Sequence, residues 1–503
     1  MTRRLYNIFL LLAMCFNIAA QKTDSPINSS LDSVFMWFRN ANYPTLKFGT
    51  LKVENYSASI SDSLIQISLS KPFKNVNLRE DAINALKDSI SKNLPAPYKN
   101  FDVELYISSK NIYDYVPNEM RKETKKDNSR MLKLRNRDKD ELTNVVTKVS
   151  APCTPSAGLQ GRNIALWASH GYYFEPSQNL WILQRPRFWG ISEDTYTPSV
   201  VLPYLIPMLE NAGANVFYPR ERDVQKNEVI VDFETAKETE YVEENARRAK
   251  WHNPDPDRVD TTGYAPKKKI YRHGDNPFAD GSFRTIRSHP NGSAYTDWIP
   301  EIPEDGEYAV YISYKSVPKS ADDAHYTVFH TGGETEFVVD QTKGGGTWIY
   351  LGTFKFKAGS NPEFGKVRLT NQSVEKGKHI TADAVRFGGG VGCVERSIAP
   401  VAGAPEPFYF TREKPKYLEC ARYWLQMAGF SDSVYCGQNN EYKTDYMSRA
   451  IWVNALSGGS PLNTRTKGKG VPIDLALALH TDAGIDSTTV GSLAIFLTSD
   501  MGK

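Results

Sequence analysis

Two nearly apolar runs stand out in the hydrophobic pattern of the chain. Residues 164 to 169 read Ile-Ala-Leu-Trp-Ala-Ser, and residues 473 to 479 read Ile-Asp-Leu-Ala-Leu-Ala-Leu. Short runs of this kind, bounded by turn residues, are typical of strands that are buried on both faces of a parallel sheet. Segments with helical spacing of apolar residues lie near both runs. We therefore expect one α/β domain, divided between residues 161–250 and residues 393–503.

The segment after Glu193 has the spacing of an amphipathic helix. Four apolar residues keep that spacing: Val201, Leu205, Met208 and Leu209. Pro203 and Pro207 fall inside the same segment, and each removes one helix hydrogen bond. The pattern therefore predicts a kinked or broken helix that ends near Gly213.

The pattern changes between the two halves of the expected α/β domain. Residues 251–392 are rich in glycine, tyrosine and β-branched residues, with turn signals about every ten residues. Asp305-Gly306 is a strong hairpin signal ahead of an alternating strand at residues 308–314. We expect an all-β sandwich inserted in the α/β domain.

The N-terminal part of the chain has a pattern of its own. Strands are expected near residues 64–69 and 103–107, with a helix between them that places Leu86 and Ile90 on one face. Residues 28–118 are therefore predicted to form a small α/β module. Residues 119–150 are predicted to be a charged linker, because nine Lys or Arg and only three acidic residues lie between 121 and 139.

Charge narrows the class of function. Lys and Arg total 61 against 58 acidic residues. A nucleic-acid-binding protein would carry a clustered basic excess, so we expect no nucleic-acid partner. The local basic run is interpreted as a solvated linker, with attraction to an anionic wall polymer as the alternative.

The first residues are typical of an export signal. Arg3-Arg4 precede an apolar stretch that ends near Ala20 and is too short to favour a membrane span. We expect a signal peptide over residues 1–20 and a periplasmic or extracellular protein. Anchoring as a lipoprotein through Cys15 is the less favoured alternative, because Met14 is bulky. Four further cysteines permit disulfides in three alternative pairings: Cys153, Cys393, Cys420 and Cys436.

Three residues with metal-ligand chemistry lie at the ends of the expected core elements. His170 follows the first apolar run, Glu193 precedes the expected helix, and His480 follows the second run. Ligands favour the carboxyl edge of open α/β sheets. Two imidazoles and one carboxylate form a catalytic zinc set with an open fourth position. The alternatives are a hydrogen-bonded structural histidine and, for Glu193 as for Asp194, compensation of a helix dipole.

The order of these residues resembles the zinc-dependent N-acetylmuramoyl-L-alanine amidases. The features that carry the resemblance are Ser169-His170-Gly171, Glu193-Asp194, Val216 to Arg220, Arg449 with Asn454, and Leu479-His480. The resemblance covers residues 161–232 and 394–503. It implies that zinc held by His170, Glu193 and His480 serves to cleave the amide between N-acetylmuramic acid and L-alanine in peptidoglycan. Arg449 and Asn454 are interpreted as scaffold.

A hydrolase of this kind also needs a carboxylate that passes a proton to the leaving amine. In the family this is a glutamate some distance after the third metal ligand, whereas here only residues 481–503 remain. The resemblance therefore implies a C-terminally truncated second half, with the usual glutamate beyond Lys503. Asp482, where the family usually has asparagine, is the candidate within the chain. Its alternative role is to orient a ligand or a backbone amide.

The inserted segment has a resemblance of its own. Residues 379–387, together with Gly306-Glu307-Tyr308, are similar to the carbohydrate-binding-like domain of golvesin and xanthan lyases. This similarity implies a jelly-roll module. Four aromatic residues could stack on sugars, although their alternating spacing favours the core: Tyr311, Tyr314, Trp348 and Tyr350. Two other functions stay open, a non-catalytic protein that binds glycan or cell wall and a xanthan-lyase-like enzyme that acts on polysaccharide.

Overall fold

The computed structural model describes residues 26–43, 49–125, 144–151, 158–397, 409–437 and 440–481. The chain divides into two compact units. The first comprises Met1–Arg135 with Ala483–Lys503, and the second comprises Asn136–Asp482. The predicted signal peptide, Cys15, Cys153 and Asp482 lie outside the described residues.

The first unit contains a four-stranded sheet and two helices that share one apolar core. Strands β2 and β3 pair in parallel, and the predicted strands near residues 64–69 and 103–107 are confirmed. Leu86 and Ile90 are buried on one face of the helix between these strands, as their spacing predicts. The elements are α2 (Pro26–Asn42), β1 (Val53–Ser59), β2 (Leu64–Leu69), α3 (Glu80–Asn93), β3 (Asp102–Ile107) and β4 (Lys110–Asn111).

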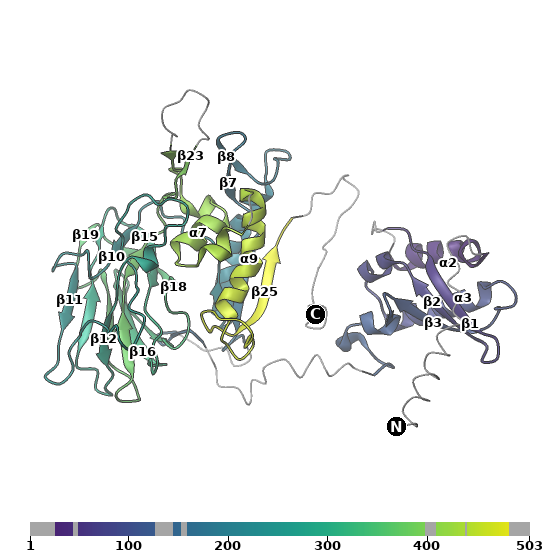
Figure 1. Cartoon of the computed structure of the whole chain (residues 1–503), viewed down its shortest axis with the longest axis horizontal. Coiled ribbons are helices and arrows are strands. Elements are labelled where there is room, and N and C mark those ends of the chain that lie inside the picture. The colour runs from purple at the N-terminus through teal and green to yellow at the C-terminus, as the bar shows by residue number, and fades with distance from the viewer. Residues whose placement is uncertain are drawn as a thin grey trace, which may run out of the picture. The chain divides into compact units, whose positions relative to one another are not determined.

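The second unit contains a sandwich of two antiparallel sheets (Figure 1). One sheet has the order β10 (Val229–Val231), β22 (Val385–Phe387), β15 (Gly306–Ile312) and β18 (Ile349–Phe356). The other has the order β11 (Tyr241–Glu244), β13 (Tyr295–Trp298), β20 (Lys366–Thr370), β16 (Ala324–His330), β17 (Gly333–Val339) and β5 (Val146–Lys148). Two short ladders complete it, β12 (Arg284–Arg287) with β21 (His379–Ala382), and β14 (Glu301–Ile302) with β19 (Gly359–Ser360). The expected β-sandwich is therefore present.

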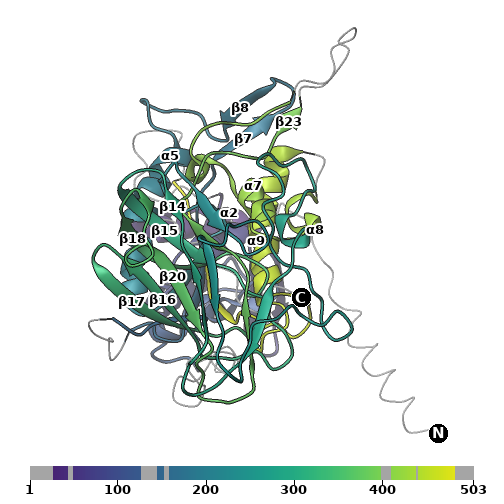
Figure 2. The ribbon, with the colours of Figure 1, turned by 90° about the vertical axis from the view of Figure 1, so that its left-hand side faces the viewer.

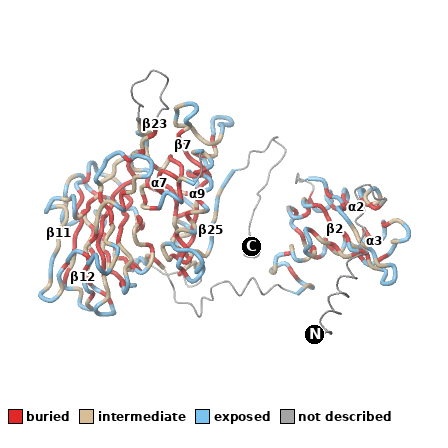
Figure 3. The backbone as a smooth tube through the Cα atoms, in the orientation of Figure 1, coloured by how far each residue is buried: buried red, intermediate tan, exposed pale blue. Residues whose placement is uncertain are grey.

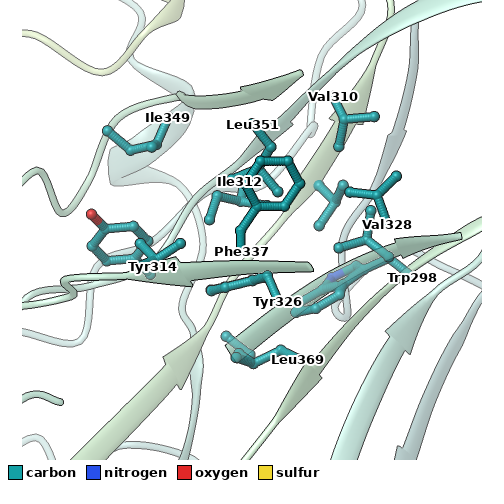
Figure 4. Close-up of a cluster of buried hydrophobic side chains, with 14 of the residues drawn as sticks. Trp298, Val310, Ile312, Tyr314, Tyr326, Val328, Phe337, Ile349, Leu351 and Leu369 are labelled. Atoms are coloured by element: carbon teal, nitrogen blue, oxygen red, sulfur yellow. The ribbon is translucent and has the colours of Figure 1, made fainter. Parts of the chain in front are cut away.

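Side chains from the inner faces of both sheets form the core of the sandwich (Figure 4). Trp298 belongs to this core and has no solvent exposure, and its indole Nε1 donates to the Asp383 carbonyl at 3.0 Å. Tyr314 is buried in the same core, which is the role that its alternating spacing favours. The core thus draws on strands that are far apart in the sequence.

Three strands of the sandwich fall outside the range 251–392 that the sequence pattern indicates. β10 pairs with β22, and β11 pairs with β13, although both lie in the segment expected to belong to the α/β domain. β5 pairs with β17, although it lies in the expected charged linker 119–150. These strands have only three or four residues, which is too short for a pattern of alternation to show.

The rest of the second unit is built on a parallel three-stranded sheet, ordered β25 (Ile473–Leu479), β6 (Asn163–Ala168) and β9 (Asn215–Phe217). The expected break in the helix after Glu193 is confirmed. α5 (Glu193–Val200) gives way to a π-helical turn, η4 (Val201–Leu205), and then to α6 (Ile206–Asn211). The π turn begins two residues before Pro203, which cannot donate a helix hydrogen bond.

Helices lie on both faces of this parallel sheet. Ile164 and Leu166 of β6 pack with Val201 and Ile206 on one face. Ala165, on the other face of the same strand, packs in a cluster with residues of α7 (Ala421–Met427) and α9 (Glu441–Ser457). Successive residues of a strand point to opposite faces, so the apolar run of β6 serves both layers.

The sandwich and the helical layer share an apolar cluster. Tyr311 and Trp348 of the sandwich are buried in it with Leu425 of α7 and Trp452 of α9. Figure 1 and Figure 2 show α7 and α9 beside the sandwich. Figure 3 shows that the burial continues from the sandwich into these helices, whereas β25 carries several exposed residues. The inserted module is therefore packed as part of the second unit.

Two further features of the described residues are the state of the cysteines and the lack of a membrane-spanning helix. Cys393, Cys420 and Cys436 are free thiols, so no disulfide joins any of these three, contrary to the pairings that their number permits. Within the described ranges, no helix combines the length and the apolar composition that crossing a membrane requires.

A pair of phenylalanines tests the assignment of the core. Phe337 is 1% exposed in β17, whereas Phe364 is 54% exposed. Phe337→Ala is expected to lower the free energy of unfolding by about 3–5 kcal/mol, because it removes a buried ring and leaves a cavity. Phe364→Ala is the matched control and should change it by less than about 0.5 kcal/mol. Urea unfolding followed by tryptophan fluorescence measures both, and equal losses would contradict the assignment.

Candidate metal centre

His170 and His480 lie at the same edge of the sheet because their strands are parallel and end opposite each other. Leu479, the last residue of β25, pairs with Ala168, the last residue of β6. The carboxyl ends of parallel strands meet at one edge of a sheet. Ser169 donates its backbone N–H to the Leu479 carbonyl at 2.7 Å, and its φ of 21° turns the chain so that His170 leaves the strand direction. The two histidines therefore lie side by side, with ring centroids 5.0 Å apart.

Glu193 completes the group from the first residue of α5. Its Oε1 lies 2.8 Å from Nδ1 of His480 and 3.9 Å from Nε2 of His170. One ligand atom from each of the three residues lies within 4.8 Å of the others. The side chains of His170 and Glu193 are 4% and 9% exposed, whereas that of His480 is 41% exposed, so the group opens to solvent on the His480 side.

The donor set fits zinc. Zinc bonds of about 2.0–2.2 Å in a tetrahedral arrangement place ligand atoms about 3.4 Å apart, so the observed spacings need only small shifts of side chains. Nε2 of His170 is buried and has no hydrogen-bond partner. A buried polar atom without a partner is costly, and a bound cation would satisfy it. These observations fit a zinc site formed by the three residues once the contact between Arg449 and His170 is released.

The surroundings keep the His170 ring neutral. Burial lowers the pKa of His170 to about 3, and the nearby positive charge of Arg449 adds to this effect. A metal ligand must offer the neutral imidazole, since the protonated ring has no free lone pair. His170 is therefore held in the charge state that coordination needs.

Arg449 also sets a condition for coordination. Its Nη2 donates to Nδ1 of His170 at 3.2 Å. Because a guanidinium only donates, the neutral ring in this arrangement carries its proton on Nε2. Binding of a cation at Nε2 requires that proton to move to Nδ1 and Arg449 to withdraw. Asp445, whose Oδ2 lies 3.3 Å from Arg449 Nη2, offers a place for the withdrawn guanidinium.

Arg220 fixes the loop that carries His170. It is 1% exposed, and its guanidinium donates to the carbonyls of Ala168, His170, Tyr417 and Glu419. Gly171 follows His170 because no side chain fits there. A Cβ at Gly171 would lie 2.8 Å from Arg220 Nη2 and 2.9 Å from the backbone nitrogen of Cys420. The His-Gly pair is thus a packing requirement of the centre.

Of the other residues singled out in the sequence, Arg449 contacts the candidate metal group, whereas Asn454 and Asp194 lie outside it. Arg449, interpreted from the sequence as scaffold, contacts His170 directly. Asn454 is exposed on α9, and its carbonyl accepts the Gly458 N–H that ends the helix. Asp194 lies outside the metal group. Its Oδ2 accepts the Arg185 N–H at 3.0 Å, and burial raises its pKa to about 6.

Two residues near the centre were not identified from the sequence. Arg185 Nε lies 3.5 Å from Glu193 Oε2, and Asp445 pairs with Arg449. Asp445 and Arg449 are four residues apart on α9, and that spacing was a signal available in the sequence. Arg185 had no such signal, because its distance to Glu193 depends on the path of a loop.

Asp482 lies outside the described residues, so its proposed part in proton transfer stays a prediction. The residue before it, Thr481, contacts one of the three candidate ligands through its backbone. Thr481 donates its backbone N–H to Glu193 Oε1 at 3.3 Å. The backbone just after His480 is therefore still in contact with Glu193.

An aromatic turn stands just ahead of Glu193. Phe188 and Ile191 exchange two backbone hydrogen bonds of 2.8 and 2.9 Å, which close a two-residue turn through Trp189 and Gly190. Trp189 has a φ of 48°, an unfavourable conformation for a bulky residue, and is 97% exposed. Four residues span at most about 14 Å of extended chain, so the exposed indole is anchored near Glu193.

Metal content tests the centre. The full chain is expected to bind one zinc ion, and Glu193→Ala or His480→Ala should weaken zinc binding at least about a hundredfold, because each removes one of three protein ligands. The matched control is His252→Ala, since His252 is exposed and outside the group. Competition with a chelator of known affinity measures the change. Equal zinc affinity in His480→Ala and the parent would contradict the assignment.

Comparison with known proteins covers the β-rich part of the chain. Residues 274–389 match the Golvesin C-terminal domain. A xanthan lyase from Bacillus sp. (strain GL1) is 34% identical over 97 residues, which are 19% of this chain and 10% of that enzyme.

Two solved structures also align with the chain. The structure of Paenibacillus xanthan lyase aligns at 24% identity and a TM-score of 0.23 over 32% of this chain and 13% of that one. The C-terminal CBM6 of LamC, a laminarinase from Zobellia galactanivorans, aligns at 15% identity and a TM-score of 0.18 over 32% of this chain and 99% of that one. The chain thus spans about a tenth of the curated relative that it matches, and residues 274–389 are similar to a Golvesin C-terminal domain.

Proposed function

We propose that the protein is a zinc-dependent hydrolase that cleaves the amide between N-acetylmuramic acid and L-alanine in peptidoglycan. The observation that carries the proposal is the convergence of His170, Glu193 and His480 at one edge of the parallel sheet. Two imidazoles and one carboxylate are the set used by catalytic zinc sites, which keep one position open. The proposed substrate follows from the resemblance of the surrounding sequence to amidases.

The residues of the chain have distinct parts in this proposal. Zinc, when bound, supplies Lewis-acid activation of water and polarisation of the amide carbonyl. His170 offers a neutral imidazole from a buried position, and Arg220 holds its loop rigid. The exposed side of His480 leaves room for a substrate to approach. Such pre-organisation keeps the reacting groups in place without rearrangement during the reaction.

In this proposal the aromatic turn is a binding surface for the glycan part of the substrate. Trp189 presents a flat apolar surface four residues before Glu193, and Phe188 beside it is 55% exposed. Exposed aromatic side chains in a rigid turn are suited to contact with the apolar face of a sugar ring, because they lose little conformational freedom on binding. In this proposal the turn holds the glycan strand while the stem peptide lies at the metal centre.

A second candidate function is glycan or cell-wall binding without catalysis. It is favoured by the match of residues 274–389 to a Golvesin C-terminal domain and by the similarity of 97 residues to a xanthan lyase. The metal group would then have a structural role only. A polysaccharide lyase is a third outcome, which the products of the reaction distinguish.

Digestion of purified peptidoglycan separates these functions. The zinc-loaded chain is expected to release stem peptides with a free N-terminal L-alanine slowly, because the sequence offers no glutamate in the proton-transfer position of the resembled family, and Glu193→Ala is expected to release none above background. Products are identified by liquid chromatography with mass spectrometry. Binding to peptidoglycan without any release of peptide would favour the adhesive function. Unsaturated uronic-acid products from an acidic polysaccharide would favour a lyase.

The aromatic turn is tested separately from the metal. Trp189→Ala is expected to raise KM for peptidoglycan about threefold to tenfold, since it removes one stacking surface, while zinc content stays at one per chain. Met208→Ala, at a residue that is 69% exposed elsewhere on the surface, is the control. Unchanged KM in Trp189→Ala would remove the turn from the proposal.

Asp482 has its own test. We expect Asp482→Asn to keep its zinc and to change the rate of hydrolysis less than about threefold, because a side chain that only orients a neighbour tolerates the amide. Initial rates and zinc content of the variant and its parent are compared at the same pH. A loss of hydrolysis with full zinc content would make Asp482 the group that accepts the proton.

A further inference from the structure

A second cavity lies away from the metal centre, between the sandwich and helix α7. Its volume is about 390 Å³, within the range of small-molecule sites. Strands β10 and β22 supply Ile230 and Arg386, helix α7 supplies Trp424, and the loop before the sandwich core supplies Tyr271. None of these residues belongs to the metal group.

Arg386 lines this cavity, and two of its donors are buried and unused. Its Nη1 donates to Glu221 Oε2 at 2.6 Å and to Glu228 Oε1 at 3.2 Å, and its guanidinium lies 4.0 Å from the centre of the Tyr311 ring. Nε and Nη2 have no hydrogen-bond partner, although the side chain is only 3% exposed. These two atoms form the edge of a guanidinium that matches the two oxygens of a carboxylate.

The carboxylate of Glu228, which lines the cavity beside Arg386, is already paired with a lysine. Both oxygens of Glu228 accept from Lys416 Nζ, at 2.8 and 2.7 Å. The second edge of Arg386 is therefore left without an acceptor among the described residues that line the cavity. A buried donor without an acceptor is costly, which points to an acceptor that arrives with a ligand.

The side chains that line the cavity indicate which other chemical groups a ligand would have. Tyr264, Trp348 and Trp424 give the cavity aromatic surfaces, which suit a ring with an apolar face. The hydroxyl of Tyr271 is buried without a hydrogen-bond partner, although the residue is only 3% exposed. It can pair with a hydroxyl group of a ligand. Lys269, which is exposed, lines the same cavity and favours an anion, whereas Lys268 beside it is paired with Asp275 at 2.9 Å.

We propose that this cavity binds a sugar that carries a carboxylate, with the carboxylate on the Nε and Nη2 edge of Arg386 and a ring hydroxyl on Tyr271. The sugar ring lies against the aromatic walls. The proposal rests on the cavity alone and does not depend on the metal centre or on the hydrolysis proposed for it.

Direct titration tests the site in the full chain without added zinc. Calorimetry is run with D-glucuronate and with N-acetylmuramic acid, which carry the carboxylate at different places. D-glucose has the ring without the carboxylate, and acetate has the carboxylate without the ring. We expect saturable binding of at least one sugar acid, at least about tenfold tighter than glucose or acetate, because only the acid uses both the guanidinium edge and the walls. Absence of binding by both acids, or equal binding of glucose, would overturn the proposal.

Two variants connect the binding to this cavity. Arg386→Lys keeps the positive charge beside Glu221 but removes the paired donors, so it should weaken binding at least about tenfold. Tyr271→Phe removes only a hydroxyl that has no partner, so the melting temperature should not fall while affinity drops about threefold or more. This second variant decides the matter if the first does not fold. Tyr204→Phe, at a residue that is 64% exposed, is the matched control. Unchanged affinity in Tyr271→Phe would contradict the assignment.

Discussion

The parallel pairing of β6 with β25 is the constraint on which the candidate metal centre depends. The register sets Leu479 opposite Ala168, so that His480, one residue after its strand, and His170, two residues after its strand, leave the sheet at the same edge. A slip of one residue would shift one histidine by about 3.3 Å and turn the alternating side chains to the opposite faces. Because β6 packs Ile164 and Leu166 against one layer and the small Ala165 against the other, such a slip would exchange large and small side chains between the two buried layers. The packing of the sheet therefore fixes the spacing of the three proposed metal ligands.

Two neighbouring residues connect this edge of the sheet to the sandwich. Arg220 donates to the carbonyls of the His170 loop, and Glu221 accepts from Tyr311 at 2.5 Å and from Arg386 at 2.6 Å. Both residues are almost completely buried, and breaking a buried charge pair by removing one partner is strongly destabilising. The sandwich therefore supports the loop that carries His170. Such a link explains why the inserted module shares its apolar cluster with the helical layer.

The sequence predicts the local features of this arrangement well. The apolar run of β6 indicates a buried strand, the prolines at 203 and 207 indicate the broken helix, and the turn signals indicate the sandwich. The run of β25 indicates a strand too, but the prediction that it is buried on both faces is wrong, because β25 lies at the edge of the sheet and three of its residues are exposed. The contact of Arg449 with His170 could not be predicted, because it depends on how α9 packs against the sheet. The same holds for β10 and β5, whose short segments become strands only through pairing with distant partners. The amidase-like fold and activity of the α/β part remain predictions from the resemblance.

The central claim is that His170, Glu193 and His480 together hold a zinc ion. Anomalous diffraction from crystals of the zinc-loaded chain, recorded on both sides of the zinc absorption edge, tests it directly. The account predicts one strong anomalous peak at about 2.0–2.2 Å from a nitrogen of each histidine and an oxygen of Glu193. It also predicts that Arg449 no longer donates to Nδ1 of His170. A chain that carries zinc elsewhere, or that shows no peak among these three side chains, would contradict the account.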